Sequence, residues 1–100
     1  MTFAIDFTQT AADHVRAFGK FEQQIVLGAV EEQLRHEPTT ETRNKRRLGP
    51  SALSNWELRV GNFRVFYEVI LENEQQAVKI TAVGRKEHNK LYVGGKETLL

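Results

Sequence analysis

The chain contains no cysteine, which excludes disulfide bridges, thiolate metal sites and a cysteine nucleophile. Its first residues lack the basic start and apolar run of a secretory signal peptide. No stretch approaches the roughly 20 consecutive apolar residues that span a bilayer. These absences predict a soluble, cytoplasmic protein that makes no contact with a membrane.

Common nucleotide-binding, hydrolase and metal-binding motifs are also missing. The sequence has no Gly-rich phosphate loop and no Gly-x-Ser-x-Gly elbow. Its three histidines, His14, His36 and His88, are far apart in the sequence, and none has a second ligand three or four residues further along. We therefore expect neither a metal site nor a cofactor.

The 100 residues suit one domain, because two domains of half this length would each bury too little apolar surface. The net charge of +1 conceals an uneven distribution. Residues 1–42 carry three Lys/Arg against seven Asp/Glu, a net of −4, whereas residues 43–100 carry eleven against six, a net of +5. The asymmetry indicates a polyanion-binding surface in the second half, and a mixed solvated surface is the alternative.

The first half predicts one strand and two helices. Alternation of apolar residues over Phe3–Phe7 indicates a short strand. A first helix is capped by Thr8 or Thr10, and a second helix runs from about Lys20 to His36. The second helix has apolar residues at helical spacing, which predict its buried stripe: Phe21, Ile25, Ala29, Val30 and Leu34.

The second half alternates apolar and polar residues and predicts an antiparallel meander. Its expected strands and turns are, in order, 46–48, the Gly49-Pro50 turn, 56–60, the Gly61-Asn62 turn, 63–69 and 77–83. The fold class is therefore α+β: an N-terminal strand, a helical hairpin, then an antiparallel β-meander with the helices packed on one sheet face.

The register of the predicted 56–69 hairpin carries the first chemical argument. With Gly61-Asn62 as its loop, the apolar pairs on one face are Val60–Phe63, Leu58–Val65 and Trp56–Tyr67. The same register places Arg59 directly across from Arg64 on the opposite face. Like charges at such a position are destabilising. Either water screens them fully, or the two guanidinium forks hold an anion such as a phosphate.

Two further basic segments are candidates for binding RNA. The segment 84–92 follows a predicted strand, and it contains His88 and Tyr92 as proton-transfer candidates. The run 43–47 is the second segment. Exposure to solvent without a function is the alternative for each. Their predicted RNA-binding residues are Arg43, Lys45, Arg46, Arg47, Arg85 and Lys90, and Lys86 is a further cation.

The stretch Trp56–Val69 (WELRVGNFRVFYEV), followed by Val83–Tyr92 (VGRKEHNKLY), resembles the RelE/ParE toxin superfamily. Lys45–Gly49 (KRRLG) adds to this resemblance, which covers nearly the whole chain. It implies a toxin of a type II toxin–antitoxin system that a cognate antitoxin neutralises. RelE-like members are ribosome-dependent endoribonucleases that cut messenger RNA, whereas ParE-like members poison DNA gyrase.

The resemblance also implies individual site residues. Arg64 matches the family's arginine after the hairpin turn, and Tyr92 matches its C-terminal tyrosine. Lys86 or Arg85 matches the basic residue after the Val-Gly pair, and Arg59 matches a strand lysine. A RelE-like reaction needs no metal, because the ribose 2′-hydroxyl attacks the neighbouring phosphate and leaves a 2′,3′-cyclic phosphate.

Glu57 departs from the family pattern, because RelE has a lysine at the corresponding position. His88 is the candidate that replaces the missing group. The sequence therefore predicts an mRNA-cleaving toxin whose catalytic residues are Arg64, Tyr92, Lys86, Arg59 and His88. A gyrase inhibitor and a catalytically inactive antitoxin-binding relative are the alternatives. We also expect an exposed apolar groove between helices and sheet, where an antitoxin helix or strand docks.

Overall fold

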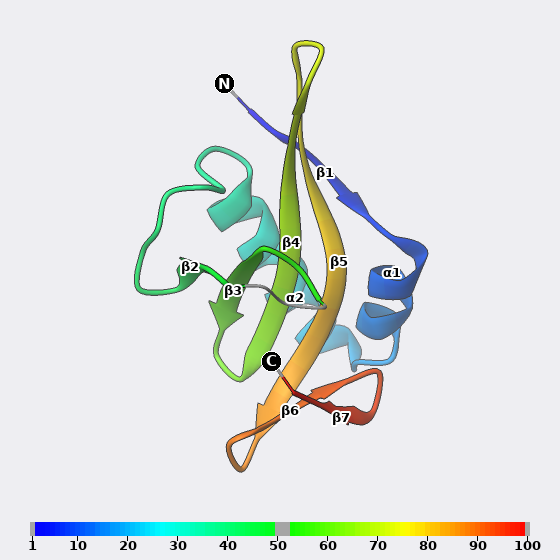
Figure 1. The fold of residues 1–100 in the computed structure, drawn as a ribbon. Helices are drawn as coiled ribbons and strands as arrows, with labels where there is room; N and C mark the ends of the chain where they lie inside the picture. Colours follow the sequence, from blue (N-terminus) through cyan, green and yellow to red (C-terminus); the bar gives the residue numbers. More distant parts are fainter. Residues whose placement is uncertain (1, 50–52, 100) are drawn as a thin grey trace.

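The computed structural model describes residues 2–49 and 53–99. Two helices pack on one face of a sheet with the strand order β2-β3-β4-β5-β6-β7, and β1 lies beside β5 (Figure 1). The predicted α+β class is confirmed. The elements are β1 (Ala4–Phe7), α1 (Gln9–Arg16), α2 (Lys20–Leu34), β2 (Lys45–Arg47), β3 (Trp56–Val60), β4 (Phe63–Glu72), β5 (Gln75–Glu87), β6 (Lys90–Val93) and β7 (Lys96–Thr98).

Side-chain caps fix the start of each helix. Thr8, one of the two predicted caps, begins α1: its hydroxyl accepts a hydrogen bond from the Ala11 N–H at 3.0 Å. At the start of α2, Glu22 Oε1 accepts from the Gly19 N–H at 3.1 Å, which is half of a capping box. Within the described ranges, neither helix is long and apolar enough to cross a membrane.

The predicted stripe of α2 is confirmed in part, because Val30 and Leu34 are buried as expected. Val26, Val30 and Leu34 enter the core, whereas Phe21 is 74% exposed and Ile25 is 40% exposed. The buried residues repeat at intervals of four, and so do the two exposed residues, so each set fits one side of a helix. Because α2 is apolar around much of its circumference, periodicity could not choose between them.

The β3–β4 hairpin has the predicted register, with Val60 opposite Phe63 and Arg59 opposite Arg64. Gly61 at the first turn position has a φ of 58°, a conformation that glycine adopts without steric cost. The predicted edge strand at 46–48 forms one residue earlier, at 45–47. Pro50 of the predicted Gly49-Pro50 turn lies outside the described residues.

The sheet is larger than the predicted meander. β1 pairs in parallel with β5, and β5 continues past the predicted end at Val83 to Glu87. Two more strands, β6 and β7, then follow. Their tight turns are His88-Asn89 and Gly94-Gly95, and all four residues have positive φ. Two-residue turns of this kind join antiparallel strands closely.

A β-bulge in β5 decides which side chains share a face. Tyr67 opposes Ile80, but the preceding Phe66 opposes Ala82, so Thr81 is an extra residue. Ile80 and Val83 therefore both belong to the core under the helices. The bulge reverses the alternation for the rest of β5.

The sheet thus separates two apolar clusters. The larger lies between the sheet and both helices, on what we call the helix-covered face. A smaller cluster of Phe66, Ala82 and Leu91 lies on the other side, the helix-free face, where Leu48 and Leu53 pack against it. The helix-free face also carries the alternating residues Glu57, Arg59, Arg64 and Lys86.

The tight approach of β6 to β5 gives a test of this packing. A Cβ added at Gly84 would lie 2.6 Å from the Tyr92 carbonyl oxygen. We expect Gly84→Ala to lower the free energy of unfolding by about 1–3 kcal/mol. Gly28 in α2 is the matched control, because its Cβ would meet nothing within 4 Å. Gly28→Ala should raise stability by up to about 1 kcal/mol. Urea unfolding measures both, and a neutral Gly84→Ala would contradict the packing.

Candidate functional site

Two arginines face each other on the helix-free face. Arg59 is exposed, whereas only 8% of Arg64 is exposed. Arg64 Nη1 donates to the carbonyl oxygens of Gly61 at 2.8 Å and Phe63 at 2.9 Å. In residues 2–49 and 53–99, these are its only hydrogen bonds to protein, and both use the same nitrogen. Nε and Nη2 therefore donate no hydrogen bond to the described residues.

The environment of Arg64 favours an anion. Burial lowers the pKa of the Arg64 guanidinium, and the charges of Arg59 and Arg46 lower it further, while Glu57 opposes them. The group stays protonated at neutral pH because the ordinary pKa of arginine is so high. Its charge is nevertheless poorly solvated and repelled by its neighbours. A phosphate placed between Arg59 and Arg64 would relieve both effects.

Arg46 and Glu57 complete this cluster. They are opposite each other across β2 and β3, and Arg46 Nε lies 3.4 Å from Glu57 Oε1. The Glu57 residue is only 2% exposed, whereas the Arg46 side chain is more than half exposed. The result is a surface of three guanidinium groups around one buried carboxylate.

The turn between β5 and β6 lies at the end of the sheet that also holds the β3–β4 turn (Figure 1), and Lys86 and His88 belong to this hairpin. The Lys86 N–H donates to the Asn62 carbonyl oxygen at 2.7 Å, which ties β5 to that turn. Lys86 opposes Leu91 on the helix-free face, so it shares a face with Arg64. His88 is exposed at the tip of the β5–β6 hairpin, with a φ of 52°.

Tyr92 and Arg85 lie on the opposite side of the sheet from Arg64. The two oppose each other across β5 and β6. The Arg85 guanidinium stacks over the rings of Phe18 at 5.3 Å and Phe63 at 5.0 Å, both of which pack on the helix-covered face. The expected grouping of Tyr92 with Arg64 is therefore wrong. The bulge at Thr81 and strict alternation along β6 explain the separation.

Arg85 forms a structural clasp. Its Nη2 lies 2.5 Å from Glu22 Oε2 at the start of α2, and its Nη1 lies 3.8 Å from Glu87 Oε1. The clasp holds the helical hairpin to β5. The sheet separates Arg85 from Arg64, and the contact of Arg85 with RNA stays a prediction.

The basic run 43–47 is divided by the fold. Lys45 is only 4% exposed, and its Nζ donates to the carbonyl oxygens of Gln33 at 3.2 Å and Glu37 at 2.8 Å. It caps the end of α2, so its predicted contact with RNA is wrong. Arg43 and Arg47 are exposed, and Arg47 opposes Trp56 on the helix-covered face. Of the run, Arg46 shares the face of Arg64.

Lys90, also a predicted RNA contact, is exposed, and its Nζ lies 4.0 Å from Glu97 Oε1. This distance marks a loose surface ion pair that contributes little to stability. Nothing in the fold buries Lys90 or ties it to the arginine cluster. Its contact with RNA stays a prediction.

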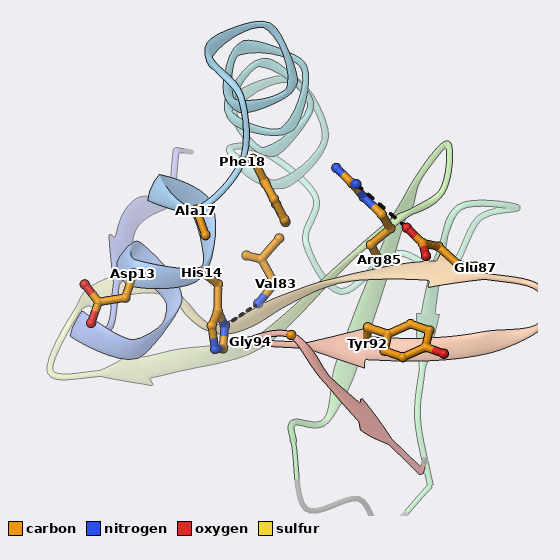
Figure 2. A pocket seen from close by; sticks show the side chains of 10 residues that line it. Asp13, His14, Ala17, Phe18, Val83, Arg85, Glu87, Tyr92 and Gly94 are labelled. Carbon is orange, nitrogen blue, oxygen red and sulfur yellow. Dashed lines mark hydrogen bonds and ion pairs between the residues drawn. The ribbon is translucent and has the colours of Figure 1, made fainter.

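A cavity of about 580 Å³ lies on the helix-covered face between α1 and the β5–β6–β7 region (Figure 2). Phe18 and Tyr92 line it, together with His14. His14 Nδ1 accepts a hydrogen bond from the Val83 N–H at 3.2 Å. Burial lowers the pKa of His14, and the nearby charge of Asp13 partly offsets this. His14 thus joins α1 to β5 as a neutral imidazole.

Comparison with known proteins agrees with the architecture. A chain from the crystal structure of the toxin–antitoxin complex RelBE2 of Mycobacterium tuberculosis has the same fold, with a TM-score of 0.70. The match covers 86% of this chain and 100% of that chain, at 21% sequence identity. The fold is therefore that of a RelE-like α+β domain.

The sequence narrows this class to a family. Residues 5–89 match the ParE toxin family of type II toxin–antitoxin systems, parDE. The chain therefore belongs to this family, which confirms the predicted RelE/ParE membership. No curated protein matches it.

The His14 contact predicts a pH dependence of stability. Because the folded pKa lies below 6.5, the unfolded chain binds a proton more readily as the pH falls. The contribution of His14 is complete above pH 6.5 and declines as the pH falls below that value. We expect unfolding midpoints in urea at pH 7.5 and 5.5 to differ less in His14→Gln than in the parent chain. His88→Gln should keep the parent difference, and an unchanged difference in His14→Gln would refute this role.

Proposed function

We propose that this ParE-family chain is a type II toxin that cleaves messenger RNA on the ribosome without a metal ion. The Arg59–Arg64 pair is the observation that carries the proposal. The hairpin register forces two like charges together on the helix-free face, and burial keeps one of them poorly solvated. A phosphodiester is the RNA group that best satisfies such a pair.

The arginine pair stabilises the reaction at the phosphorus. Arg59 and Arg64 hold the non-bridging oxygens of the phosphate that is to be cut. As the ribose 2′-oxygen attacks, negative charge builds up on these oxygens, and fixed guanidinium groups stabilise it without reorganisation. Arg46, beside Glu57 on the same face, adds a third positive charge to this surface.

The proton transfers use groups at the end of the β5–β6 hairpin. The imidazole of His88 takes the proton of the 2′-hydroxyl, and the new O2′–P bond forms. The P–O5′ bond breaks, and the Lys86 ammonium gives its proton to the leaving 5′-oxygen. The products are a 2′,3′-cyclic phosphate and a 5′-hydroxyl. Tyr92 has no part in this scheme, because it lies across the sheet from Arg64.

Inhibition of DNA gyrase is the second candidate function. The separation of Tyr92 from Arg64 favours it, because a tyrosine that the resemblance implies for cleavage is not beside the phosphate-binding arginines. In a gyrase inhibitor, the arginine pair would not be needed for chemistry. Growth arrest would then persist without new ends in cellular RNA.

We further propose that a helix of the cognate antitoxin docks on α2 and the adjoining groove. Exposed Phe21 and Ile25 stand one helical turn apart. Ile25 continues into a groove of about 370 Å³ that Val60 also lines. Glu22, Glu87 and Arg85 also line it, two carboxylates against one guanidinium, so we expect the antitoxin helix to carry apolar residues flanked by a lysine or arginine.

Induced expression of the chain alone, with primer-extension mapping of messenger RNA, tests the nuclease function. We expect new cuts in translated regions with the parent chain, and at least a hundredfold fewer with Arg64→Ala, because one preorganised charge contributes about 10²–10³ in rate. Tyr92→Phe is the matched control on the opposite face and should cut normally. Growth arrest without cuts would shift the assignment to gyrase, and loss of cutting in Tyr92→Phe would refute the scheme.

The antitoxin surface is tested by co-purification of the toxin with its tagged antitoxin and by the dissociation constant of the pair. We expect Phe21→Glu to weaken binding at least tenfold, since a charge replaces an apolar anchor. Leu71→Glu is the control, because Leu71 is 66% exposed on β4, away from α2. If Leu71→Glu weakened binding and Phe21→Glu did not, the antitoxin would dock on the β4–β5 hairpin instead.

A further inference from the structure

We propose that Glu57 is a positioning residue that converges the three arginines of the helix-free face on a single phosphate. The inference rests on the proposed function, because it concerns the same surface. It assigns a role to the residue at which this chain departs from the resemblance to RelE. A carboxylate in a phosphate-binding surface otherwise works against binding, so its position calls for an explanation.

The sheet places Glu57 at the centre of the arginines. Arg46 is its direct neighbour on β2, at 3.4 Å between Nε and Oε1. Arg59 is two residues further along the same strand and therefore on the same face. Arg64 is on the neighbouring strand β4 and lies diagonally across from Glu57, because Glu57 directly opposes Phe66, two residues away from Arg64. The carboxylate thus contacts Arg46 and shares its face of the sheet with Arg59 and Arg64, and its charge counteracts the lowering of the Arg64 pKa.

The burial of Glu57 shows how it acts. Its side chain is 3% exposed, while the Arg46 side chain that it binds is 56% exposed. A substrate on the surface therefore meets the guanidinium groups and cannot reach the carboxylate. This excludes Glu57 as a general base that touches RNA. Its contribution passes through the arginines, whose directions it restricts.

Removing the Glu57 charge distinguishes positioning of the arginines from simple electrostatic attraction of an anion to the face. Removing the Glu57 charge makes the face more positive, and a long RNA strand, held largely by counterion release, should bind at least as tightly. A single phosphate ion depends on convergent donors, so it should bind more weakly once Arg46 is released. Cleavage, which needs the same convergence at one phosphate, should slow as well. Positioning therefore predicts opposite changes for the two ligands.

The experiment uses the purified full chain and its Glu57→Gln variant. Glu72→Gln is the charge-matched control, because Glu72 is exposed at the end of β4. Titrations measure the affinity for inorganic phosphate and for a ten-nucleotide RNA that is 2′-O-methylated at each position and so cannot be cleaved. We expect Glu57→Gln to bind phosphate at least fivefold more weakly and the oligonucleotide no more weakly than the parent. Glu72→Gln should change neither affinity by more than twofold. Single-turnover cleavage of ribosome-bound messenger RNA should slow at least tenfold only in Glu57→Gln.

Two further variants keep the test decisive. If Glu57→Gln does not fold, Arg46→Gln removes the other partner and should reproduce the loss of phosphate affinity. Glu57→Asp should restore part of it. Tighter binding of both ligands by Glu57→Gln, or cleavage at the parent rate, would overturn the inference. If the parent chain cleaves no RNA but the phosphate and oligonucleotide affinities still change in opposite directions, the nuclease function fails and the positioning role stands.

Discussion

The register of the β3–β4 hairpin is the constraint on which the rest of the site depends. Gly61 closes a two-residue turn, and the apolar pairs under the helices leave no freedom to shift β3 against β4. A shift of one residue would move the core side chains into water. Because the core fixes this register, Arg59 must stand opposite Arg64 on the other face. The stability of the helix-covered face thus maintains the repulsion on the helix-free face.

The two faces of the sheet carry different sets of charged residues and contacts. On the helix-covered face, Arg85 is held by Glu22 and two aromatic rings, and His14 links α1 to β5. These contacts hold the helices in place, and the groove beside α2 that we assign to the antitoxin lies next to the Arg85 clasp. On the helix-free face, Arg46 contacts the buried Glu57 carboxylate, and Arg59 and Arg64 oppose each other nearby. A toxin built this way would bind its inhibitor and its RNA on different sides of one sheet.

Sequence patterns predicted the features that depend on residues close together in the chain, such as turns and strand alternation. Alternation and the Gly-Asn turn gave the β3–β4 register, and therefore the Arg59–Arg64 pair. They could not reveal the extra residue at Thr81, because a bulge depends on how β4 and β5 fit together. That one residue reverses the alternation in β5 and helps to place Tyr92 across the sheet from Arg64. Lys45 shows the same limit: a lysine inside a basic run looks like a surface charge until the end of α2 is placed above it. Glu57 stood out as a departure from the family pattern, but its burial against Arg46 required the pairing of β2 with β3.

The central claim is that RNA meets the arginines of the helix-free face. Nuclear magnetic resonance of the arginine side-chain N–H groups during titration with a short, uncleavable RNA tests it most directly, because every arginine reports separately. The account predicts large shifts for Arg46, Arg59 and Arg64 at low RNA concentration, with Arg85 unchanged in its clasp. Shifts confined to Arg85 and to residues around the His14 cavity would contradict the account and place the RNA, or another ligand, on the opposite side of the sheet.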